Sequence, residues 1–292
     1  MHTGLGVWVV PQILVTGGTG YLGHEVLKAL EKRGLAYELL GRAQGFDLFW
    51  PFQIEERFLR KYGSEDQDLL LLHLAAMSKV SECQEKPEDA SRVNVESTGA
   101  LAQCIRSLGG RMVFTSTDLV FDGEHPPYDE KALPKPLMVY GETKAAGEDF
   151  VLEDANNLVL RLPLLYGPSF DGRHGASDPL LHSLRKGERV RLFSDEIRTP
   201  LEVSTAAETL VDLAMKPERK GIQHLPGPKA LSRFQLGWML AERAGCDVSL
   251  IQEASRLDWP GAPRPKDCSL ATLVSPLDEP KEPEKGQGTA LP

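Results

Sequence analysis

The sequence has few of the features that mark disulfide-stabilised, metal-binding or membrane-spanning proteins. Its 292 residues include four cysteines that lie far apart and form no CxxC pair, so neither a disulfide framework nor a zinc site is indicated. No apolar run approaches the length of a transmembrane helix, and the first residues lack the basic start and cleavage site of a secretory signal. We therefore expect reduced cysteines, a cytoplasmic protein, no membrane partner and no catalytic metal ion.

The sequence also has no excess of positive charge. The formal net charge is -9 and the pI is about 5.4, whereas nucleic-acid binders carry a basic surface, so no nucleic-acid partner is expected. The hydrophobic content of 41% is ordinary for a globular protein. Residues 276–292, by contrast, consist mainly of Pro, Glu, Lys and Gly, which predicts a disordered tail.

Short apolar runs alternate with helical patterns along the first half of the chain. The apolar runs predict strands at 13–16, 37–40, 68–76, 111–117 and 157–162. Apolar residues at helical spacing predict helices at 22–33, 91–108, 202–216 and 231–244. Alternating strands and helices indicate an α/β protein with a Rossmann-type, doubly wound parallel sheet.

The regular alternation of strand and helix patterns ends near residue 163, which suggests two regions. We predict a dinucleotide-binding domain over 1–162 and a smaller substrate-binding region over 163–275, interleaved with the first. The second region begins with a loop rich in Gly, Asp and Ser at 167–179, and it is expected to cover the carboxyl ends of the strands, where ligands of such folds bind.

A glycine-rich turn joins the first predicted strand to the first predicted helix. The stretch ILVTGGTGYLG places four glycines within seven positions, which lets a pyrophosphate approach the backbone at a helix N-terminus. Two spacings fit the same letters. One is Gly18-x-Gly20-x-x-Gly23, the common dinucleotide reading, and the other is Gly17-x-x-Gly20-x-x-Gly23.

The end of the second predicted strand bears on the choice of cofactor. Sites that prefer NAD place an acidic residue about 20 positions after the glycine turn, where it binds the ribose 2′-hydroxyl. Here the chain reads Leu40-Gly41-Arg42-Ala43, without a carboxylate. Arg42 is suited to a 2′-phosphate, so NADP(H) is predicted and NAD is the alternative.

Two polar motifs predict acid–base chemistry on a carbonyl group. Tyr140 and Lys144 are four residues apart, which places them on one face of a helix. An ammonium next to a phenol lowers the pKa of the phenol, which gives a tunable proton donor. Ser116 and Thr117 end a buried strand, where a hydroxyl can bond to a substrate carbonyl oxygen.

Taken in order, these motifs resemble a known family. TGxxGxxG, HLAA, STDLVFDG, VYGETKAAGE and RLPLLYGP are similar to those of extended short-chain dehydrogenase/reductases and, more narrowly, of the dTDP-4-dehydrorhamnose reductase group. The resemblance runs from about residue 12 to 273 and favours the spacing that starts at Gly17. It implies reduction of a 4-keto nucleotide sugar, with hydride from NADPH and a proton from Tyr140.

The resemblance also implies roles for individual residues. The catalytic residues would be Thr117, Tyr140 and Lys144, with Tyr140 and Lys144 also contacting the cofactor and Ser116 and Arg198 contacting the substrate. Arg198 would meet the diphosphate of the nucleotide, or else form a surface ion pair with Asp195 or Glu196. The remaining cofactor contacts would be Gly17, Thr19, Gly20, Tyr21, Leu22, Gly23, Gly41, Arg42, Asp47, Leu48, Leu74, Ala75, Ala76, Ser78 and Leu165.

Two departures from the reductase pattern leave other functions open. Leu164 and Leu165 stand where the reductases usually carry an aromatic residue, and the tail replaces a final amphipathic helix. The chain is also similar to the NADP-binding regulatory beta subunit of methionine adenosyltransferase. The alternatives are therefore such a regulatory subunit and an NAD-dependent nucleotide-sugar epimerase, with a homodimer or a partner enzyme subunit as the assembly.

Overall fold

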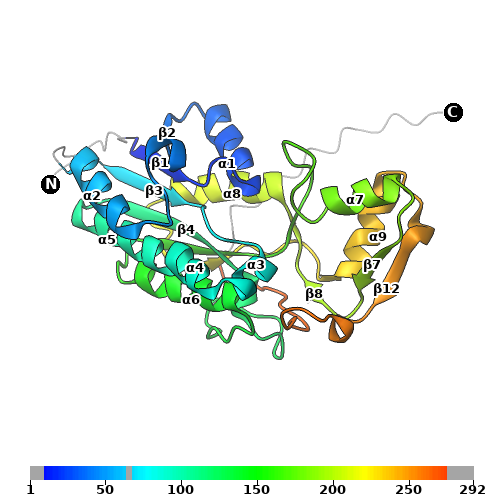
Figure 1. The fold of residues 1–292 in the computed structure, drawn as a ribbon. Coiled ribbons are helices and arrows are strands. Elements are labelled where there is room, and N and C mark those ends of the chain that lie inside the picture. The colour runs from blue at the N-terminus through cyan, green and yellow to red at the C-terminus, as the bar shows by residue number, and fades with distance from the viewer. Residues whose placement is uncertain (1–9, 64–67, 275–292) are drawn as a thin grey trace.

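The computed structural model describes residues 10–63 and 68–274, so the predicted tail at 276–292 lies outside the described residues. The centre of the fold is a six-stranded parallel sheet (Figure 1). Its strands are β1 (Gln12–Thr16), β2 (Tyr37–Leu40), β3 (Leu69–His73), β4 (Arg111–Thr117), β5 (Leu158–Leu162) and β10 (Gly221–His224). Their order, β10-β5-β4-β3-β1-β2, confirms the predicted Rossmann-type α/β class.

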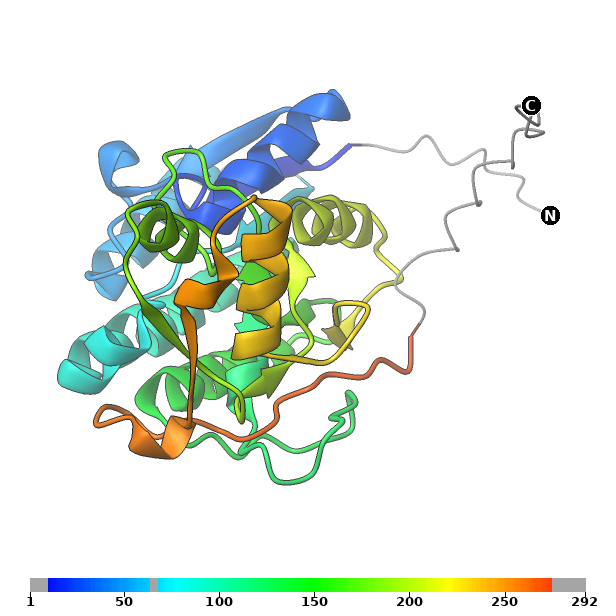
Figure 2. The same cartoon turned by 90° about the vertical axis from the view of Figure 1, so that its right-hand side faces the viewer.

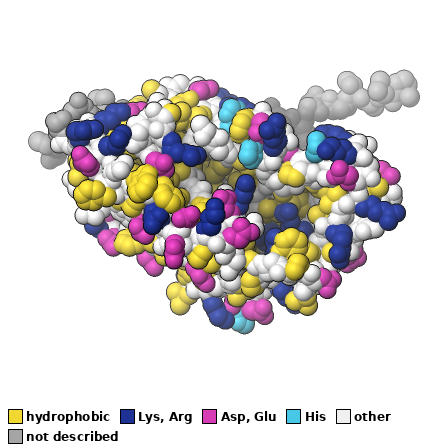
Figure 3. Space-filling view, in the orientation of Figure 1, with side chains coloured by type: hydrophobic (Ala, Val, Ile, Leu, Met, Phe, Trp, Pro, Cys, Tyr) yellow, Lys and Arg dark blue, Asp and Glu magenta, His cyan; other side chains and the backbone are white. Residues whose placement is uncertain are grey.

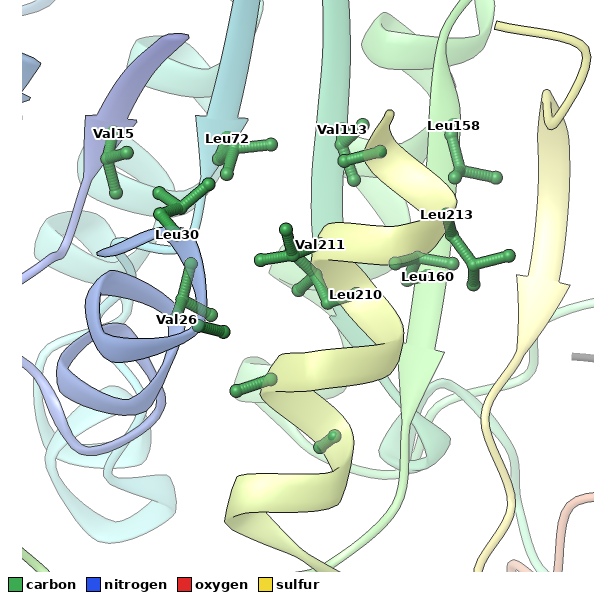
Figure 4. Packing of buried hydrophobic residues seen from close by; sticks show 14 of the residues in the cluster. Val15, Val26, Leu30, Leu72, Val113, Leu158, Leu160, Leu210, Val211 and Leu213 are labelled. Carbon is green, nitrogen blue, oxygen red and sulfur yellow. The ribbon is translucent and has the colours of Figure 1, made fainter. Parts of the chain in front are cut away.

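Helices cover both faces of the sheet. One face carries α1 (Tyr21–Lys32) and α8 (Val203–Ala214), and the other carries α2 (Pro51–Tyr62), α5 (Ser97–Ser107) and α6 (Val139–Leu152). Because successive strand residues point to opposite faces, Ile13 and Val15 pack with the first helix pair while Leu14 packs with the second set. Figure 4 shows Val26 and Leu30 of α1, and Leu210 and Val211 of α8, against the strand side chains.

The direction of the chain reverses between β1 and β3. From β1 the chain runs outward to β2 and then crosses back to β3 on the other side of β1. Open α/β sheets bind ligands at the carboxyl ends of the strands where this reversal occurs. The glycine turn after β1 and the segment after β3 both lie at this point.

The segment before α5 is less regular than predicted. Two short helices, α3 (Val80–Glu85) and α4 (Pro87–Ser91), precede a π-helical turn, η2 (Arg92–Glu96), which leads directly into α5. The single helix predicted over 91–108 is therefore wrong in its first turn. Widened turns of this kind occur mostly at functional sites.

A smaller lobe lies at one end of the sheet (Figures 1 and 2). It contains α7 (Asp178–Arg185) and α9 (Arg233–Arg243), which pack with the two-stranded sheet of β7 (Val190–Phe193) and β12 (Ile251–Ala254). The shorter pairs are β6 (Leu165–Tyr166) with β9 (Leu201–Glu202), and β8 (Ile197–Arg198) with β11 (Leu231–Ser232).

The two regions exchange segments along the chain. Residues 203–224, which follow the predicted boundary at 162/163, supply α8 and β10 to the sheet. Residues 264–272 run back along the sheet domain, with backbone bridges from Asp267 to Ile197 and from Leu270 to Tyr128. A cleft between the lobe and the sheet is thus formed by segments far apart in sequence.

Candidate active site

The glycine turn has a tight backbone that favours the second of the two predicted spacings. Gly17 has φ of 71°, and a Cβ there would lie 2.6 Å from the backbone nitrogen of Ala75. A Cβ at Gly18 would meet side-chain atoms alone, at the ends of Leu39 and Leu27. A Cβ at Gly23 would overlap the carbonyl oxygen of Gly17. Gly17 and Gly23 are thus fixed by backbone contacts, whereas Gly18 is not.

The same turn is suited to an anion. Gly20 caps α1, and no side chain accepts a hydrogen bond from the first N–H groups of this helix. Thr19 and Gly20 are exposed, and Tyr21 and Leu22 are partly buried. Because free N–H groups and the helix dipole favour negative charge, these residues fit the pyrophosphate of a dinucleotide.

The segment after β3 is held in place by a buried residue that sequence reasoning missed. The Asn94 side chain accepts a hydrogen bond from the Met77 N–H at 2.8 Å and donates to the Met77 carbonyl at 3.0 Å and to the Thr143 hydroxyl at 3.1 Å. It therefore fixes the segment that carries Leu74, Ala75, Ala76 and Ser78, and it joins this segment to α6. An amide within an otherwise apolar helix pattern was the available signal.

The other predicted cofactor residues lie at the carboxyl ends of the strands or close by. Gly41 follows β2 and begins a 3₁₀ turn that carries the exposed Arg42. Asp47 and Leu48 follow this turn, and the Leu48 carbonyl accepts a hydrogen bond from Ser97. Leu165, in β6, pairs with Leu201.

The three predicted catalytic residues come from two adjacent elements, the end of β4 and the first turns of α6. Thr117 is the last residue of β4 and is buried, and its hydroxyl interacts with the Tyr140 phenol. Tyr140 is partly buried, whereas Lys144 is 2% exposed and lies one turn further along α6. The Lys144 Nζ atom lies 3.8 Å from the centre of the Phe114 ring.

The ionisation of this site differs from the prediction. Burial raises the pKa of the Tyr140 phenol, Asp118 and Cys83 raise it further, and Thr117 and Arg198 oppose the rise. Burial lowers the pKa of Lys144 to about 7, against the opposing charge of Glu148. The pKa of Tyr140 is thus raised where the sequence predicted that Lys144 would lower it, because burial disfavours the phenolate.

The Ser116 hydroxyl is bound to another side chain, and this differs from its predicted contact with the substrate. It donates a hydrogen bond to Glu148, which also forms a buried ion pair with Arg161 at 2.6 Å. Arg161 and Glu148 are 1% and 2% exposed. The Ser116 hydroxyl thus belongs to a buried network beneath the site, which leaves Thr117 as the hydroxyl beside Tyr140.

Arg198 is bound differently from both readings of the sequence. It is buried, and its guanidinium donates two hydrogen bonds to the carboxylate of Asp118. The predicted ion pair with Glu196 is present, with the two side chains 3.9 Å apart, but it is buried and does not lie at the surface. A contact between Arg198 and a diphosphate would compete with Asp118.

Two further arginines lie near this pair. Arg264 contacts Glu196 at 3.3 Å and lies over the rings of Phe193 and Trp259. Arg233 is partly buried, and its guanidinium makes no hydrogen bond or ion pair with any residue that the structure describes. Figure 3 shows Lys and Arg side chains in the hollow between the sheet domain and the lobe. Arg233 thus differs from Arg198 and Arg264, which are bound to carboxylates.

Two buried histidines have structural partners. His73 is fully buried between the hydroxyls of Thr16 and Thr98, and burial lowers its pKa to about 3. His224 is buried and bonds to backbone carbonyls.

Within residues 10–63 and 68–274, no three His, Cys, Asp or Glu side chains are grouped to hold a metal ion. Over the same residues, no helix combines the length and apolar character that crossing a membrane requires.

Comparison with known proteins places this architecture in a family. The model of the RmlD substrate binding domain matches residues 11–276. The chain belongs to this family. Its fold and motif order are those of an extended short-chain dehydrogenase/reductase of the RmlD group, as the sequence motifs predicted.

Individual relatives carry several different names. Methionine adenosyltransferase 2 subunit beta of Rattus norvegicus is 29% identical over 89% of this chain and 80% of its own length. The probable low-salt glycan biosynthesis reductase Agl14 of Haloferax volcanii is 30% identical over 87% of this chain and 88% of its own. The structure of dTDP-4-dehydrorhamnose reductase from Bacillus anthracis in complex with NADP has a TM-score of 0.78, with 23% identity over 89% of each chain.

Proposed function

We propose that the protein is an NADP-dependent oxidoreductase that reduces a 4-keto nucleotide sugar, as dTDP-4-dehydrorhamnose reductases do. The observation that carries this proposal is the placement of Thr117, Tyr140 and Lys144 at the edge of the sheet that also presents the glycine turn. Family membership and the name of the Haloferax volcanii reductase support it. The exposed Arg42 after β2, in the absence of an acidic residue, supports NADP over NAD.

The residues of the chain divide the reaction between them. Bound NADPH supplies the hydride that reaches the carbonyl carbon. Tyr140 donates a proton to the carbonyl oxygen, and its raised pKa keeps the phenol protonated at neutral pH, which is the form a donor needs. The Thr117 hydroxyl, which donates to Asp118 in the structure, would turn to donate to the same oxygen and polarise it. Lys144 lies one turn beyond Tyr140 and contacts the ribose of the cofactor.

Arg233 is assigned to the diphosphate of the nucleotide sugar. It lies at the first position of α9 with no partner among the described residues, whereas Arg198 and Arg264 are bound to carboxylates. A guanidinium bonds to phosphate oxygens in a bidentate manner. Arg233→Met should raise KM for the nucleotide sugar about tenfold with a smaller effect on kcat, since such a bond contributes about 1.5–3 kcal/mol. An unchanged KM would remove Arg233 from this role.

A second function is supported by the relatives named as adenosyltransferase subunits. On this reading the protein binds NADP and serves as a partner of a methionine adenosyltransferase. An intact set of Thr117, Tyr140 and Lys144 is compatible with either function. An NAD-dependent epimerase is a third reading, in which the cofactor is reoxidised within each turnover and no NADPH is consumed.

One experiment separates the three readings. NADPH consumption is measured by absorbance with dTDP-4-dehydro-6-deoxy-L-mannose and with UDP- and GDP-linked keto sugars. A reductase consumes one NADPH for each product formed. Equilibration of two sugar epimers without net NADPH loss supports the epimerase. Absence of both, together with stoichiometric capture of a purified methionine adenosyltransferase, supports the partner subunit and contradicts the reductase.

A further inference from the structure

Among the residues that the structure describes, a single buried ion pair joins the C-terminal lobe to the sheet domain beside the catalytic hydroxyls. Asp118 belongs to the 3₁₀ turn η3 (Asp118–Val120), which directly follows β4, and Arg198 belongs to β8 in the lobe. Asp118 is 0% exposed and Arg198 is 5% exposed. Both carboxylate oxygens of Asp118 accept hydrogen bonds from the guanidinium. The relative placement of the two regions is therefore coupled to the position of this carboxylate.

The carboxylate is in turn bonded to the Thr117 hydroxyl. Thr117 donates to Asp118 Oδ1 at 3.2 Å and accepts a hydrogen bond from the Leu119 N–H, also at 3.2 Å. The turn is pressed against the start of α6, because a Cβ at Gly141 would lie 2.2 Å from the Leu119 carbonyl oxygen. Asp118 thus lies between Arg198 of the lobe and the two hydroxyls of Thr117 and Tyr140.

Few other charged side chains lie near Tyr140 and Arg198. Around the phenol of Tyr140, the titratable or charged neighbours are Asp118, Arg198 and Cys83, with Lys144 one helical turn away. Around Arg198 they are Asp118, Glu196, Arg233 and Cys268. Asp118 is the carboxylate that acts on the phenol, since Glu196 is not among its neighbours.

We propose that Asp118 and Arg198 form a positioning pair, through which the lobe holds a carboxylate beside the Thr117 hydroxyl and the Tyr140 phenol. A buried ion pair gains little net stability over apolar side chains of the same volume, because desolvation offsets the attraction. Because the pair lies beside the hydroxyls of Thr117 and Tyr140, it affects the position and the ionisation of those hydroxyls. A carboxylate close to a phenol disfavours the phenolate, and a guanidinium bound to that carboxylate fixes its position. The inference rests on the proposed function of Tyr140 as proton donor.

The test reads the phenol directly and needs no substrate. The alkaline titration of Tyr140 is isolated from that of the other five tyrosines by subtracting the spectrum of the matching Tyr140→Phe protein. Asp118→Asn should shift the titration to lower pH, because the carboxylate that opposes ionisation is gone. Glu196→Gln makes the same chemical change in the same ion cluster and should leave the titration in place. Equal titrations for wild type and Asp118→Asn overturn the proposal.

A kinetic measurement tests the positioning of Thr117 separately. Asp118→Glu keeps the charge but moves the carboxylate by one methylene, and this variant also serves if Asp118→Asn does not fold. It should lower kcat about ten- to a hundredfold with little change in KM, as misplaced catalytic groups do. Full kcat in Asp118→Glu contradicts the positioning role. If no substrate is turned over by the wild type, the proposed function fails while the phenol titration still tests the pair.

Discussion

The two ends of the candidate site are built by different parts of the polypeptide. At the cofactor end, backbone contacts decide the geometry, because Gly17 and Gly23 leave no room for side chains. At the substrate end, buried charges decide it, because the ion pair between Asp118 and Arg198 joins the sheet domain to the lobe. A backbone turn tolerates little substitution but is insensitive to pH. An arrangement of buried charges depends on the protonation of each member.

The largest expected effect lies at the junction of the two ends. Tyr140→Phe should leave NADPH affinity nearly unchanged and lower turnover by about 10²-fold or more, the scale of general acid catalysis. NADPH binding by fluorescence and kcat by absorbance measure the two quantities. The matched control is Tyr37→Phe, which removes a phenol from the outer strand β2 and should change neither. Normal turnover in Tyr140→Phe removes the proton donor from the proposal.

The backbone end is tested by two neighbouring glycines. Gly17→Ala should lower the free energy of unfolding by about 1–3 kcal/mol, since φ of 71° is strained for alanine, and it should also weaken NADPH binding. Gly18→Ala should be milder, because only the ends of the Leu39 and Leu27 side chains must move. Denaturant titration compares the two proteins. Equal losses would show that the turn does not depend on Gly17 in particular.

The burial of a charged side chain is tested at Lys144, one helical turn from Tyr140, by the pH dependence of stability. Burial lowers the pKa of Lys144 to about 7 in the folded protein, whereas the unfolded chain keeps the ordinary lysine value of about 10.4. Between these values the unfolded chain binds more protons, so the Lys144 contribution to stability increases with pH by about 1 kcal/mol per unit above pH 7. Lys144→Met should lack this increase. Parallel curves for the two proteins would contradict the neutralisation of Lys144.

The smallest expected effect concerns the choice of cofactor. Arg42 is exposed, so water weakens its interaction with a 2′-phosphate, and Arg42→Ala should lower the preference for NADPH over NADH only about tenfold. The ratio of the two dissociation constants measures this effect. Arg57→Ala, which removes another exposed arginine near the same turn, is the control. An unchanged ratio in Arg42→Ala would leave NAD as the equal alternative.

The difference between the two ends of the site also explains which features could be predicted from the sequence. The glycine turn, the strand at 111–117 and a helix that carries Tyr140 and Lys144 follow from local patterns. The strand was predicted at its observed bounds, whereas only the presence of the helix was predicted. The partners of Arg198 and Ser116 were not, because Asp118 lies 80 residues from Arg198 and Glu148 lies 32 from Ser116. Pairing across such separations depends on the packed fold. The raised pKa of Tyr140 was missed for the same reason, since burial is a property of the whole site.

The path of the hydride tests the central claim most directly. The protein is incubated with NADPH that carries deuterium at the transferable position of the nicotinamide, together with dTDP-4-dehydro-6-deoxy-L-mannose, and the product is analysed by NMR. We predict deuterium on the former carbonyl carbon of the sugar in the wild type and only trace product with Tyr140→Phe. Deuterium that stays in the cofactor while the sugar is unchanged would contradict the assignment of this site as a reductase.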